Sequence, residues 1–494
     1  MSARQPTNPP PQQYVDGKLG PASSGLTYPI LNPATGAVIG QAPDSTAEDV
    51  DAAIAAARRA FDETSWSTDL ALRLRCLRQL HQALLEEAPR LRELTIAEVG
   101  APAFLVAGPQ FDTPVESLAW TIDLAAGYEW ESDLGLGVTM GITSRRTVRR
   151  EAVGVVAAIT PWNFPNQINL AKVGPALAAG NTVVLKPAPD TPWLAAELGR
   201  LVAERTDIPA GVFNVVTPAD NEVAAQLTTD PRVDLVSFTG STATGRAIMA
   251  AAAPTLKRVF LELGGKSAAI VLDDADIANA AAATAFAVVV HAGQGCALTT
   301  RLVVPRASYD EAVASAALTM EALGAHDPAD PGTICGPVIS DRQRVRVQSY
   351  LELALEEGGR FATGGGLLTP ADGLAGGFWV APTVVAGLDN TARVAQEEIF
   401  GPVLVVIPHD GDDDAVRIAN ESPYGLSGSV ESGDLERAKD VARRIRTGTI
   451  GVNGGQWFNA DAPFGGYKQS GLGREMGVAG FEEYLETKLI AEPA

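Results

Sequence analysis

One cysteine, Cys296, lies in a sequence setting that suits a nucleophile. An apolar run ends at His291, the residues GQG follow, and Gly295 and Ala297 flank the cysteine. These small neighbours leave room for a planar carbonyl group to approach the sulfur. A thiol attacks as its thiolate, so its surroundings must lower its pKa or supply a base. The alternative is a small buried hydrophobic residue, which is the commoner fate of a free cysteine.

Two further residues could complete such a site. Glu262 ends the apolar stretch VFLE, and a carboxylate in an apolar setting tends to have a raised pKa, which suits a general base. Asn163 is held between Pro161 and Pro165, and its side-chain amide could donate to a developing oxyanion. A salt-bridged glutamate and a turn asparagine are the ordinary alternatives.

Three short segments could hold a dinucleotide. FTGSTATG at 238–245 follows a predicted strand and opens a predicted helix, where Gly240 permits a tight turn and helix N–H groups could bind a pyrophosphate. Lys186 ends another predicted strand and could contact ribose hydroxyls or a phosphate. EEIFGP at 397–402 places an acid and an aromatic residue before a Gly-Pro turn. A strand–helix turn, a solvent-facing lysine and an ordinary loop are the structural alternatives.

The whole sequence sets the frame for these residues. With 494 residues the chain is too long for one hydrophobic core, so at least two domains are expected. The net charge of −21 disfavours nucleic acids and anionic membranes as partners. Cys76, Cys296 and Cys335 are far apart, which predicts neither disulfides nor a metal site and favours a reducing, cytoplasmic compartment. The longest nearly apolar run, 280–290, is too short to span a bilayer.

The N-terminal third is predicted to be mainly helical after a short hairpin. The Pro- and Gln-rich segment 1–12 is expected to be a disordered arm, and turn signals at Asn32-Pro33 and Thr35-Gly36 predict a hairpin over 27–39. Ser45-Thr46-Ala47-Glu48 has the pattern of a capping box before a helix. Cys76 shares the apolar face of a second helix near 70–85, which predicts a core residue.

From residue 153 the chain alternates strands, turns and helices, which predicts an α/β fold with a parallel sheet. The predicted strands are Val153–Ile159, Thr182–Leu185, Val212–Val216, Leu235–Phe238 and Val259–Leu261. Ligands bind beyond the carboxyl ends of such strands, where the loops 160–165, 186–189, 239–245 and 262–266 lie. A second α/β block is expected to follow Cys296. Before the first of these strands, the segment 135–153 is rich in Thr, Val and Arg. This composition predicts a β-hairpin that either contacts a second subunit or presents a solvated face.

The motifs together resemble the NAD(P)-dependent aldehyde dehydrogenase superfamily along nearly the whole chain. In the order of that family, the sequence contains NPATG at 32–36, TPWNFP at 160–165, FTGS at 238–241, LELGGKS at 261–267, GQGC at 293–296, EEIFGPV at 397–403 and PFGGYKQSGLGRE at 463–475. Asn420 and the run Tyr424-Gly425-Leu426 also match. The separation of 296 − 262 = 34 between base and nucleophile is that of the family as well.

The resemblance implies a role for each matching position. Cys296 would be the nucleophile, Asn163 and the Cys296 N–H the oxyanion hole, and Glu262 the group that activates water. Lys172 and Glu475 match residues that assist proton movement. The cofactor residues implied are Thr160, Pro161, Trp162, Lys186, Gly240, Ser241, Gly245, Leu263, Gly264, Glu398 and Phe400. Among them Lys186 would contact the adenosine ribose, Ser241 the pyrophosphate, Glu398 the nicotinamide ribose and Phe400 the nicotinamide.

The family fold would divide this chain into three parts. A Rossmann-like cofactor domain would comprise 1–128 and 151–262, and an α/β catalytic domain would comprise 263–470. The β-hairpin in 129–150 and the tail 480–494 would form an oligomerisation ribbon, which implies a homodimer or homotetramer.

Cofactor and substrate preference are less closely specified. The carboxylate that usually follows the lysine by three residues in NAD-preferring members is replaced by Pro189, although Asp190 could repel a 2′-phosphate. NAD is therefore expected, with NADP left open. The family positions around the substrate tunnel read Ile168, Ala171, Gly295, Ala297, Trp457, Phe458 and Phe464. With no cation among them, an aliphatic, terpenoid or aromatic aldehyde is expected rather than a semialdehyde acid.

Two other functions remain open at this point. A CoA-acylating dehydrogenase would pass the acyl group to CoA instead of water, although such members generally lack the residue found here as Glu262. A non-catalytic dinucleotide-binding protein would keep the fold without turnover. Titrating NAD without aldehyde, then adding aldehyde and following NADH, separates these functions from aldehyde oxidation to the acid.

Overall fold

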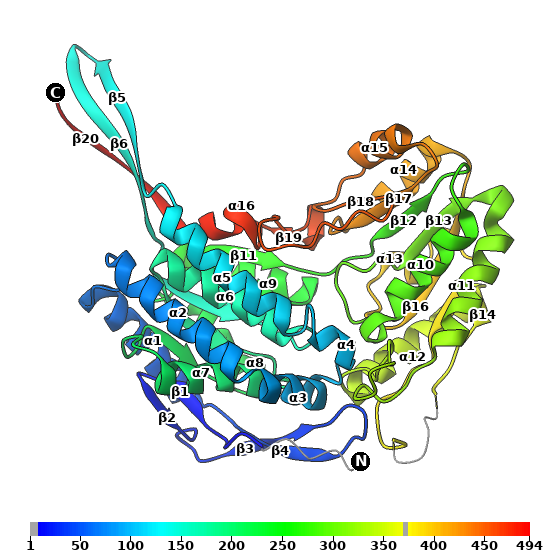
Figure 1. The fold of residues 1–494 in the computed structure, drawn as a ribbon, viewed down its shortest axis with the longest axis horizontal. Helices are drawn as coiled ribbons and strands as arrows, with labels where there is room; N and C mark the ends of the chain where they lie inside the picture. Colours follow the sequence, from blue (N-terminus) through cyan, green and yellow to red (C-terminus); the bar gives the residue numbers. More distant parts are fainter. Residues whose placement is uncertain (1–7, 369–373) are drawn as a thin grey trace.

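The computed structural model describes residues 8–368 and 374–494. In that part of the chain two open sheets form two bodies, and a long ribbon projects from one of them (Figure 1). The predicted α/β class is confirmed. Of the predicted disordered arm, residues 1–7 lie outside the described residues, and residues 8–12 precede the first strand without regular secondary structure.

The first sheet has eight strands among the described residues, in the order β19-β11-β10-β7-β8-β9-β1-β2. The central strands β11, β10, β7, β8 and β9 are parallel, as predicted from the alternating pattern. The strands are β1 (Gln13–Val15), β2 (Lys18–Gly20), β7 (Val155–Ile159), β8 (Thr182–Lys186), β9 (Phe213–Val215), β10 (Leu235–Thr239), β11 (Arg258–Glu262) and β19 (Gly471–Leu472).

Helices cover both faces of this sheet, which explains why its strands are almost wholly apolar. In β7, Val156 and Ala158 pack towards α2, α5 and α6, whereas Val155 and Ala157 pack towards α1, α8 and α9. The helices of this body are α1 (Ala47–Glu63), α2 (Leu70–Glu86), α3 (Ala88–Val99), α4 (Ala103–Val106), α5 (Asp112–Gly127), α6 (Pro165–Ala179), α7 (Trp193–Arg205), α8 (Asn221–Thr229), α9 (Thr242–Ala252) and α16 (Gly477–Glu482), with a short 3₁₀ turn, η1 (Ala253–Thr255), after α9. Cys76 is fully buried on α2, as expected.

The strand order of the first sheet reverses between β7 and β10. The chain runs from β7 outwards through β8 to β9 and then returns to β10, beside β7 on the other side. Such a reversal opens a crevice beyond the carboxyl ends of the two strands, where ligands of open α/β sheets bind. The loops at this crevice are 160–164, after β7, and Gly240-Ser241, after β10.

The second sheet has seven strands within the described ranges, in the order β14-β15-β16-β13-β12-β17-β18, all parallel except β14. Its strands are β12 (Ala268–Val271), β13 (Arg301–Pro305), β14 (Arg360–Thr363), β15 (Thr383–Ala386), β16 (Val403–His409), β17 (Gly428–Glu431) and β18 (Gly451–Val452). Its helices are α10 (Ile277–Val289), α11 (Tyr309–Leu323), α12 (Asp341–Glu356), α13 (Arg393–Gln396), α14 (Asp412–Asn420) and α15 (Leu435–Arg443), and short 3₁₀ turns are η2 (Val290–Gly293), η3 (Arg306–Ser308) and η4 (Lys468–Ser470).

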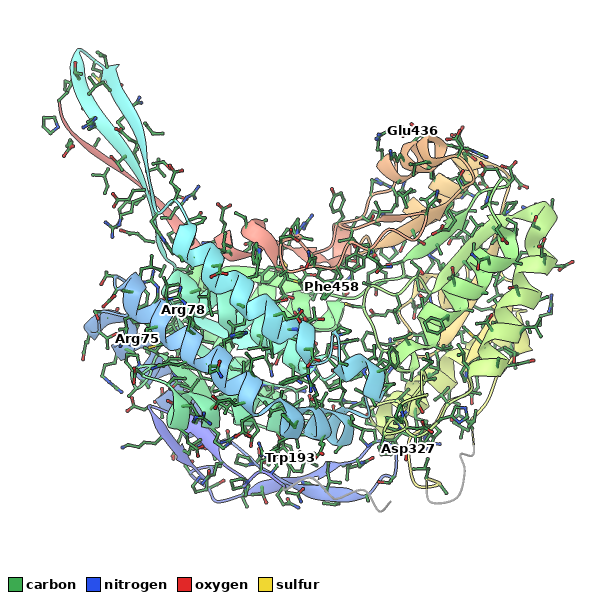
Figure 2. The ribbon with its side chains drawn as sticks, viewed as in Figure 1. Arg75, Arg78, Trp193, Asp327, Glu436 and Phe458 are labelled. Atoms are coloured by element: carbon green, nitrogen blue, oxygen red, sulfur yellow. The ribbon has the colours of Figure 1, made fainter. Side chains whose placement is uncertain are left out.

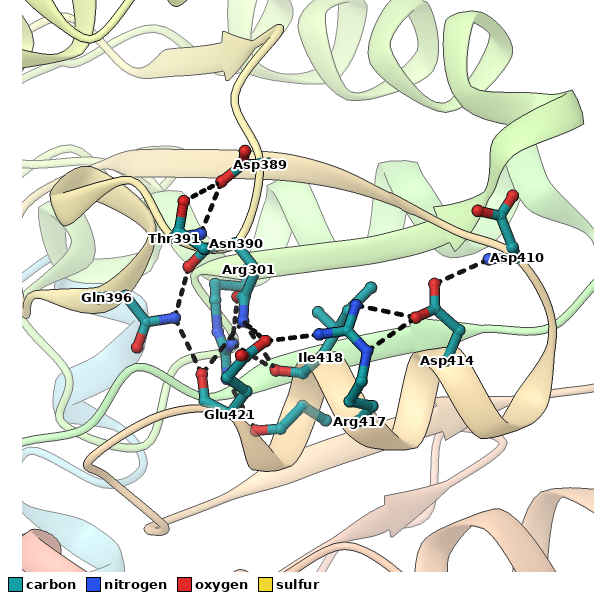
Figure 3. A network of polar contacts seen from close by, with 11 residues as sticks. Arg301, Asp389, Asn390, Thr391, Gln396, Asp410, Asp414, Arg417, Ile418 and Glu421 are labelled. Atoms are coloured by element: carbon teal, nitrogen blue, oxygen red, sulfur yellow. Dashed lines mark hydrogen bonds and ion pairs between the residues drawn. The ribbon is translucent and has the colours of Figure 1, made fainter.

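A buried arginine joins several segments of this second body. Arg301 begins β13 and donates to Asn390 Oδ1 at 2.8 Å, to Ile418 O at 3.0 Å and to Ala419 O at 3.1 Å. Figure 3 shows how its guanidinium meets the carboxyl end of α14, whose last carbonyls lack partners within the helix. Its Nε also donates to Lys266 O at 2.9 Å, in the loop that enters β12. One side chain therefore fixes that loop against the second sheet.

The ribbon is a three-stranded antiparallel sheet in the order β20-β6-β5. It consists of β5 (Glu131–Thr139), β6 (Ile142–Ala152) and the C-terminal strand β20 (Leu485–Pro493), and it points away from both bodies (Figure 1). The predicted hairpin and the β-prone tail thus pair with each other. A second hairpin, β3 (Thr27–Leu31) and β4 (Val38–Pro43), matches the turn signals at Asn32-Pro33.

The capping box predicted from Ser45-Thr46-Ala47-Glu48 was shifted by one residue. The N-cap of α1 is Thr46, whose hydroxyl accepts from Asp49 N, while Asp49 accepts from Thr46 N at 2.8 Å. Ser45 is instead used for tertiary contacts: its hydroxyl donates to Gln13 Oε1 at 2.6 Å and accepts from Thr217 N. An aspartate at this position closes the same reciprocal pair as the glutamate that the pattern anticipated.

Two negative observations apply to residues 8–368 and 374–494. No helix there is both long and apolar enough to cross a membrane. The same residues contain no group of three or more His, Cys, Asp or Glu side chains placed to hold a metal ion.

Candidate active site

The loop that carries Cys296 turns sharply after α10. His291, Ala292 and Gly293 take left-handed backbone angles in succession, with φ of 52°, 51° and 71°. A β-carbon on Gly293 would collide with the backbone of Gly401, so glycine is required at that approach. The turn places Cys296, which is partly exposed, at the amino end of β13.

The Glu262–Lys266 loop lies against the cysteine. It runs from the carboxyl end of β11 to the amino end of β12, and β12 is paired with β13 from Ala268 and Arg301 onwards. A β-carbon on Gly265 would be 2.6 Å from the carbonyl oxygen of Cys296, so the two loops touch there. The carboxyl edge of the first sheet thus meets the amino edge of the second sheet around the sulfur.

The surroundings of the Cys296 thiol disfavour its thiolate form. Burial raises the pKa of the Cys296 thiol well above its usual range, and the negative charges of Glu398, Glu262 and Glu475 raise it further, in that order. A resting thiol of this kind must lose its proton to a base before or during attack on a carbonyl.

Asn163 is anchored to the Cys296 loop from another loop. It follows β7, is only 4% exposed, and its Nδ2 donates to Gln294 O at 2.9 Å. That carbonyl is two residues before Cys296, so the amide of Asn163 reaches the loop of the nucleophile. The second hydrogen of the Nδ2 group can therefore donate to an oxyanion formed on a carbon bound to the sulfur.

Glu262 is an acid held in a dry setting. It is 2% exposed, and neither carboxylate oxygen has a hydrogen-bond partner among the described residues. Burial raises its pKa well above 4.5, repulsion by Glu475 adds to this, and Lys172 and Arg474 oppose it. A β-carbon on Gly465 would be 2.5 Å from its Oε1, so the carboxylate packs against bare backbone.

Lys172 and Glu475 form a buried ion pair behind this acid. Lys172 Nζ is 2.8 Å from Glu475 Oε1 and 3.1 Å from Ser237 Oγ, and it lies over the ring of Phe260. Both charged side chains are buried, so their mutual attraction is only weakly screened. The pair is close enough to Glu262 to change the pKa of that acid.

Several of the predicted cofactor residues lie at the carboxyl ends of β7, β8 and β10. Ser241 caps α9 by accepting from Thr244 N at 3.2 Å, and the first residues of this helix are exposed. Lys186 ends β8, where burial lowers its pKa to about 8 although Asp190 opposes this. The rings of Trp162 and Phe400 meet edge to face at 5.3 Å between centroids.

Glu398 enters the crevice from the second body. Its Oε1 accepts from Gly265 N at 2.9 Å, and burial raises its pKa to about 7 while that N–H, Arg346 and Lys266 oppose the rise. A β-carbon on Gly264 would collide with this carboxylate, and one on Gly245 would meet Leu263 at 2.7 Å. An open helix start, a strand-end cation, a carboxylate and two rings are what a dinucleotide needs, so these residues fit one.

The substrate-pocket residues fall into separate groups. Ala297, Trp457 and Phe458 line a groove of about 610 Å³ between α10 and the loop after β18, and Phe458 is labelled near the middle of the molecule in Figure 2. Phe464 stacks on Trp457 at 5.6 Å and 14°.

Four of the predicted pocket residues are not among those that line that groove: Phe464, which stacks on Trp457, and Ala171, Ile168 and Gly295. Ala171 lines a smaller hollow of about 20 Å³ between α5, α6 and α16. Ile168 is buried on α6 and Gly295 packs on Leu298, and neither lines these two hollows.

Four buried side chains at the centre were not predicted. Gln110 Nε2 and His291 Nε2 both reach Asn163 O, at 2.7 and 3.0 Å, and Gln294 bonds within its own loop. Lys266 is also fully buried, without a hydrogen-bond partner among the described residues, and burial lowers its pKa to about 7. For Gln110 the sequence carries no local signal, whereas His291 and Gln294 stand in the cysteine motif itself.

Comparison with known proteins gives this geometry a family. The sequence model described as "Aldehyde dehydrogenase family" matches residues 21–490. This chain belongs to the aldehyde dehydrogenase family. The motif-based recognition and the predicted fold are therefore confirmed.

Individual relatives agree in length and fold. A curated 3-succinoylsemialdehyde-pyridine dehydrogenase from a Pseudomonas species is 42% identical over 97% of both chains. Aldehyde dehydrogenase C from Pseudomonas syringae, solved as a cysteine-to-alanine variant with NAD+ and octanal, is 41% identical, with a TM-score of 0.90 over 97% of this chain and 96% of that one. Betaine aldehyde dehydrogenase from Staphylococcus aureus, solved with NAD+, is 34% identical, with a TM-score of 0.94 over 98% and 97%.

Proposed function

We propose that this protein oxidises an apolar aldehyde to its carboxylic acid with NAD+, through a covalent adduct on Cys296. The observation that carries the proposal is that two segments meet at the loop of Cys296. The Asn163 amide reaches the loop of Cys296, and the Glu262–Lys266 loop touches the Cys296 peptide. Family membership supports the same chemistry.

In the first half of the proposed reaction the sulfur adds to the aldehyde. The Cys296 proton passes to water, the C–S bond forms and the carbonyl oxygen becomes an oxyanion, which Asn163 Nδ2 and the Cys296 N–H stabilise. NAD+, which Lys186, Ser241 and Glu398 would hold, would supply the acceptor for the hydride of the adduct carbon, and loss of that hydride would leave a thioester on Cys296. The donors matter here because charge develops on oxygen in the transition state.

In the second half, water replaces the sulfur. Glu262 as carboxylate takes a proton from water, the resulting hydroxide attacks the thioester carbon, and the C–S bond breaks to return Cys296. The overall balance is aldehyde, NAD+ and water to acid, NADH and a proton. Lys172 and Glu475, paired at 2.8 Å, hold the charge next to the base and give its proton a route away from the site.

NAD is the proposed cofactor because of the charges around the adenosine end. Lys186 lies at the end of β8, and Asp190, four residues later, is paired with Arg342 at 3.4 Å. Burial raises the pKa of Asp190. Its carboxylate would still repel the 2′-phosphate of NADP. NAD+ is the ligand in the solved relatives from P. syringae and S. aureus.

The groove favours an aldehyde without a second carboxylate. Trp457 and Phe458 supply apolar surface, and Asp276 and Glu431 line the other side without any Lys or Arg among the lining residues described. An acidic rim repels an anionic substrate. One relative is named a 3-succinoylsemialdehyde-pyridine dehydrogenase, and another is solved with octanal, an aliphatic aldehyde.

The roles of the three parts of the chain are proposed on the same basis. Residues 1–128 and 151–262 would bind the cofactor, 263–470 would supply the cysteine, and 129–150 with 480–494 would join subunits into a dimer or tetramer. The two sheets support the first two assignments, because the strands of the first sheet come from the proposed cofactor domain and those of the second sheet from the proposed catalytic domain. The exception is β19, which pairs in the first sheet although its residues 471–472 lie just past the proposed boundary at 470.

The test is an aldehyde panel run with both cofactors on the wild type and on Cys296→Ala. We expect NADH from octanal and an aryl aldehyde, at least tenfold lower kcat/KM with a semialdehyde acid, and NAD preferred to NADP. Cys296→Ala should lose turnover and keep NAD binding by calorimetry. Turnover at the wild-type rate in that variant contradicts the mechanism, and acyl-CoA as the main product on adding CoA supports the CoA-acylating alternative.

A further inference from the structure

The carbonyl oxygen of Asn163 is held by two buried side chains from different parts of the chain. Gln110, in the turn before α5, donates through Nε2 at 2.7 Å, and His291, in the η2 turn, approaches through Nε2 at 3.0 Å. Gln110 is fully buried and His291 is 1% exposed. Hydrogen bonds between such residues persist without competition from water.

These contacts close a circuit between the Asn163 loop and the cysteine loop. His291 bonds to Asn163 O, Asn163 Nδ2 donates to Gln294 O at 2.9 Å, and Gln294 Nε2 donates to His291 O at 3.0 Å. Gln294 is fixed in turn by Ile339 N, which donates to its Oε1 at 2.8 Å. Any rotation of the Asn163 peptide must therefore break a bond to the loop of the nucleophile.

The circuit fixes the tautomer of His291. A backbone carbonyl only accepts, so Nε2 must carry a hydrogen. Burial lowers the pKa of His291 to about 4, so the ring is neutral near pH 7, and Nδ1 is then a bare acceptor without a partner among the described residues. The ring also packs edge to face on Phe164 at 5.3 Å. Its backbone lies in the left-handed region at φ 52°, a conformation that persists only where the surroundings hold it.

We propose that His291 and Gln110 are positioning residues for aldehyde oxidation: they hold the Asn163 peptide so that its side-chain amide meets the oxyanion on the Cys296 adduct. This inference rests on the proposed function and adds two residues that touch neither substrate nor cofactor. Oxyanion donors act only within a narrow window of distance, about 2.7–3.1 Å from the oxygen that they stabilise. Loss of one anchor should therefore slow the step in which the oxyanion forms.

The variants are chosen so that donor and shape can be separated. His291→Leu removes the donor, whereas His291→Gln restores an N–H at the position of Nε2, since the glutamine Nε2 lies at the same distance along the side chain. Gln110→Leu removes the other donor to the same carbonyl. If His291→Leu does not fold, Gln110→Leu carries the same test.

His409 provides a matched control. It is also a buried histidine, 2% exposed, and its Nε2 bonds to a backbone carbonyl, Val271 O, at the same 3.0 Å. It ends β16 in the second body, and its contacts involve neither Asn163 nor the cysteine loop. His409→Leu thus reproduces the structural loss of a buried hydrogen bond without touching the proposed circuit.

The decisive readout is the pre-steady-state burst of NADH with octanal. We expect His291→Leu and Gln110→Leu to lower the burst rate constant by about 10- to 100-fold. Their KM for NAD should stay within about twofold of the wild-type value. The burst rate constant of His291→Gln should stay within about threefold of the wild-type value. His409→Leu should lower thermal stability and leave the burst rate unchanged. Iodoacetamide alkylation of Cys296, which forms no oxyanion, should stay within threefold in all variants.

Each other result counts against the inference. A folded His291→Leu or Gln110→Leu variant with a wild-type burst removes the positioning role, as does an equal loss in His409→Leu. Parallel loss of alkylation means that the cysteine loop itself has moved. The proposed function is judged separately: a wild type that reduces no NAD+ with any aldehyde, or an Asn163→Ala variant with an undiminished burst, refutes that function rather than the role of His291.

Discussion

At the scale of single residues, the charge balance around Glu262 should be visible in the pH dependence of deacylation. Glu475 raises the pKa of Glu262 and Lys172 lowers it, while burial raises it most. The base works as a carboxylate, so activity is present above its pKa and is lost as the pH falls through it. Glu475→Gln should therefore move the acid limb to lower pH, and Lys172→Met should move it to higher pH, each by roughly half a unit to one unit.

The measurement is hydrolysis of the acyl-enzyme in single-turnover experiments between pH 5 and 9. Glu262→Gln serves as the reference, because it should show a hydride burst followed by a slow steady state without an acid limb. Shifts in the same direction for both partners of the ion pair would contradict the assigned roles. So would a limb that persists in Glu262→Gln.

The sequence predicted the proposed reacting residues better than it predicted the residues that hold them in place. Cys296, Glu262 and Asn163 stand in short motifs whose chemistry can be read locally, and the structure brings their loops together. Gln110 could not be found, because it lies 53 residues from Asn163 in an unremarkable turn. Hydrogen bonds of this kind depend on tertiary packing, which leaves no local pattern.

At the scale of elements, Arg301 should control the stability of the second body. Its guanidinium holds the carboxyl end of α14, the Asn390 side chain and the loop before β12 (Figure 3). Burial lowers its pKa to about 10, yet its hydrogen bonds go to neutral acceptors rather than to a carboxylate. Arg301→Met leaves buried carbonyls without donors and should cost about 3 kcal/mol, read from the urea midpoint.

Arg306, at the other end of the same strand, is the control. Its side chain is 60% exposed and pairs with Asp410 at 2.8 Å. Surface ion pairs contribute little to stability, so Arg306→Met should leave the urea midpoint close to that of the wild type. Equal losses in the two variants would mean that Arg301 acts only as one more ion-pair partner.

Elements were predictable where the pattern is periodic. The parallel strands β7, β8, β10 and β11 were found to within two residues, because strands buried on both faces form short apolar runs bounded by turns. The capping box at α1 was misplaced by one residue, since Ser45 and Thr46 are equally good caps locally. Contacts with Gln13 and Thr217 decide between them, and these lie far away in sequence.

For the whole molecule, the two sheets explain why the motifs of the site are spread along most of the chain. The carboxyl edge of the first sheet and the amino edge of the second meet at the site, so each body alone holds half of it. The alternating pattern indicated the first sheet and the crevice at its reversal. It could not give the position of the second body relative to the first, which depends on loops such as Glu262–Lys266.

The ribbon predicts that the working molecule contains more than one chain. Leu136 and Val138, on the same side of β5, are 64% and 69% exposed, and the rest of this strand is also exposed or only half-buried. Exposed apolar surface of this kind on a projecting sheet is typical of an interaction site, and we expect a second copy of this chain to cover it. We expect Leu136→Asp/Val138→Asp to reduce the mass measured by light scattering after gel filtration, towards the 51.4 kDa of one chain.

The control for this substitution is another exposed apolar residue away from the ribbon. Leu256, after α9, is 90% exposed in a left-handed conformation that aspartate tolerates, so Leu256→Asp should keep the wild-type mass. A wild type that is already one chain at micromolar concentration, or a ribbon variant with unchanged mass, would show that the exposed face is not a subunit contact. Because Tyr484, just before β20, bonds to Ser237, which in turn contacts Lys172, the ribbon variant should also be assayed for turnover. Its kcat should fall only if subunit contact through β20 helps to hold that buried lysine in place.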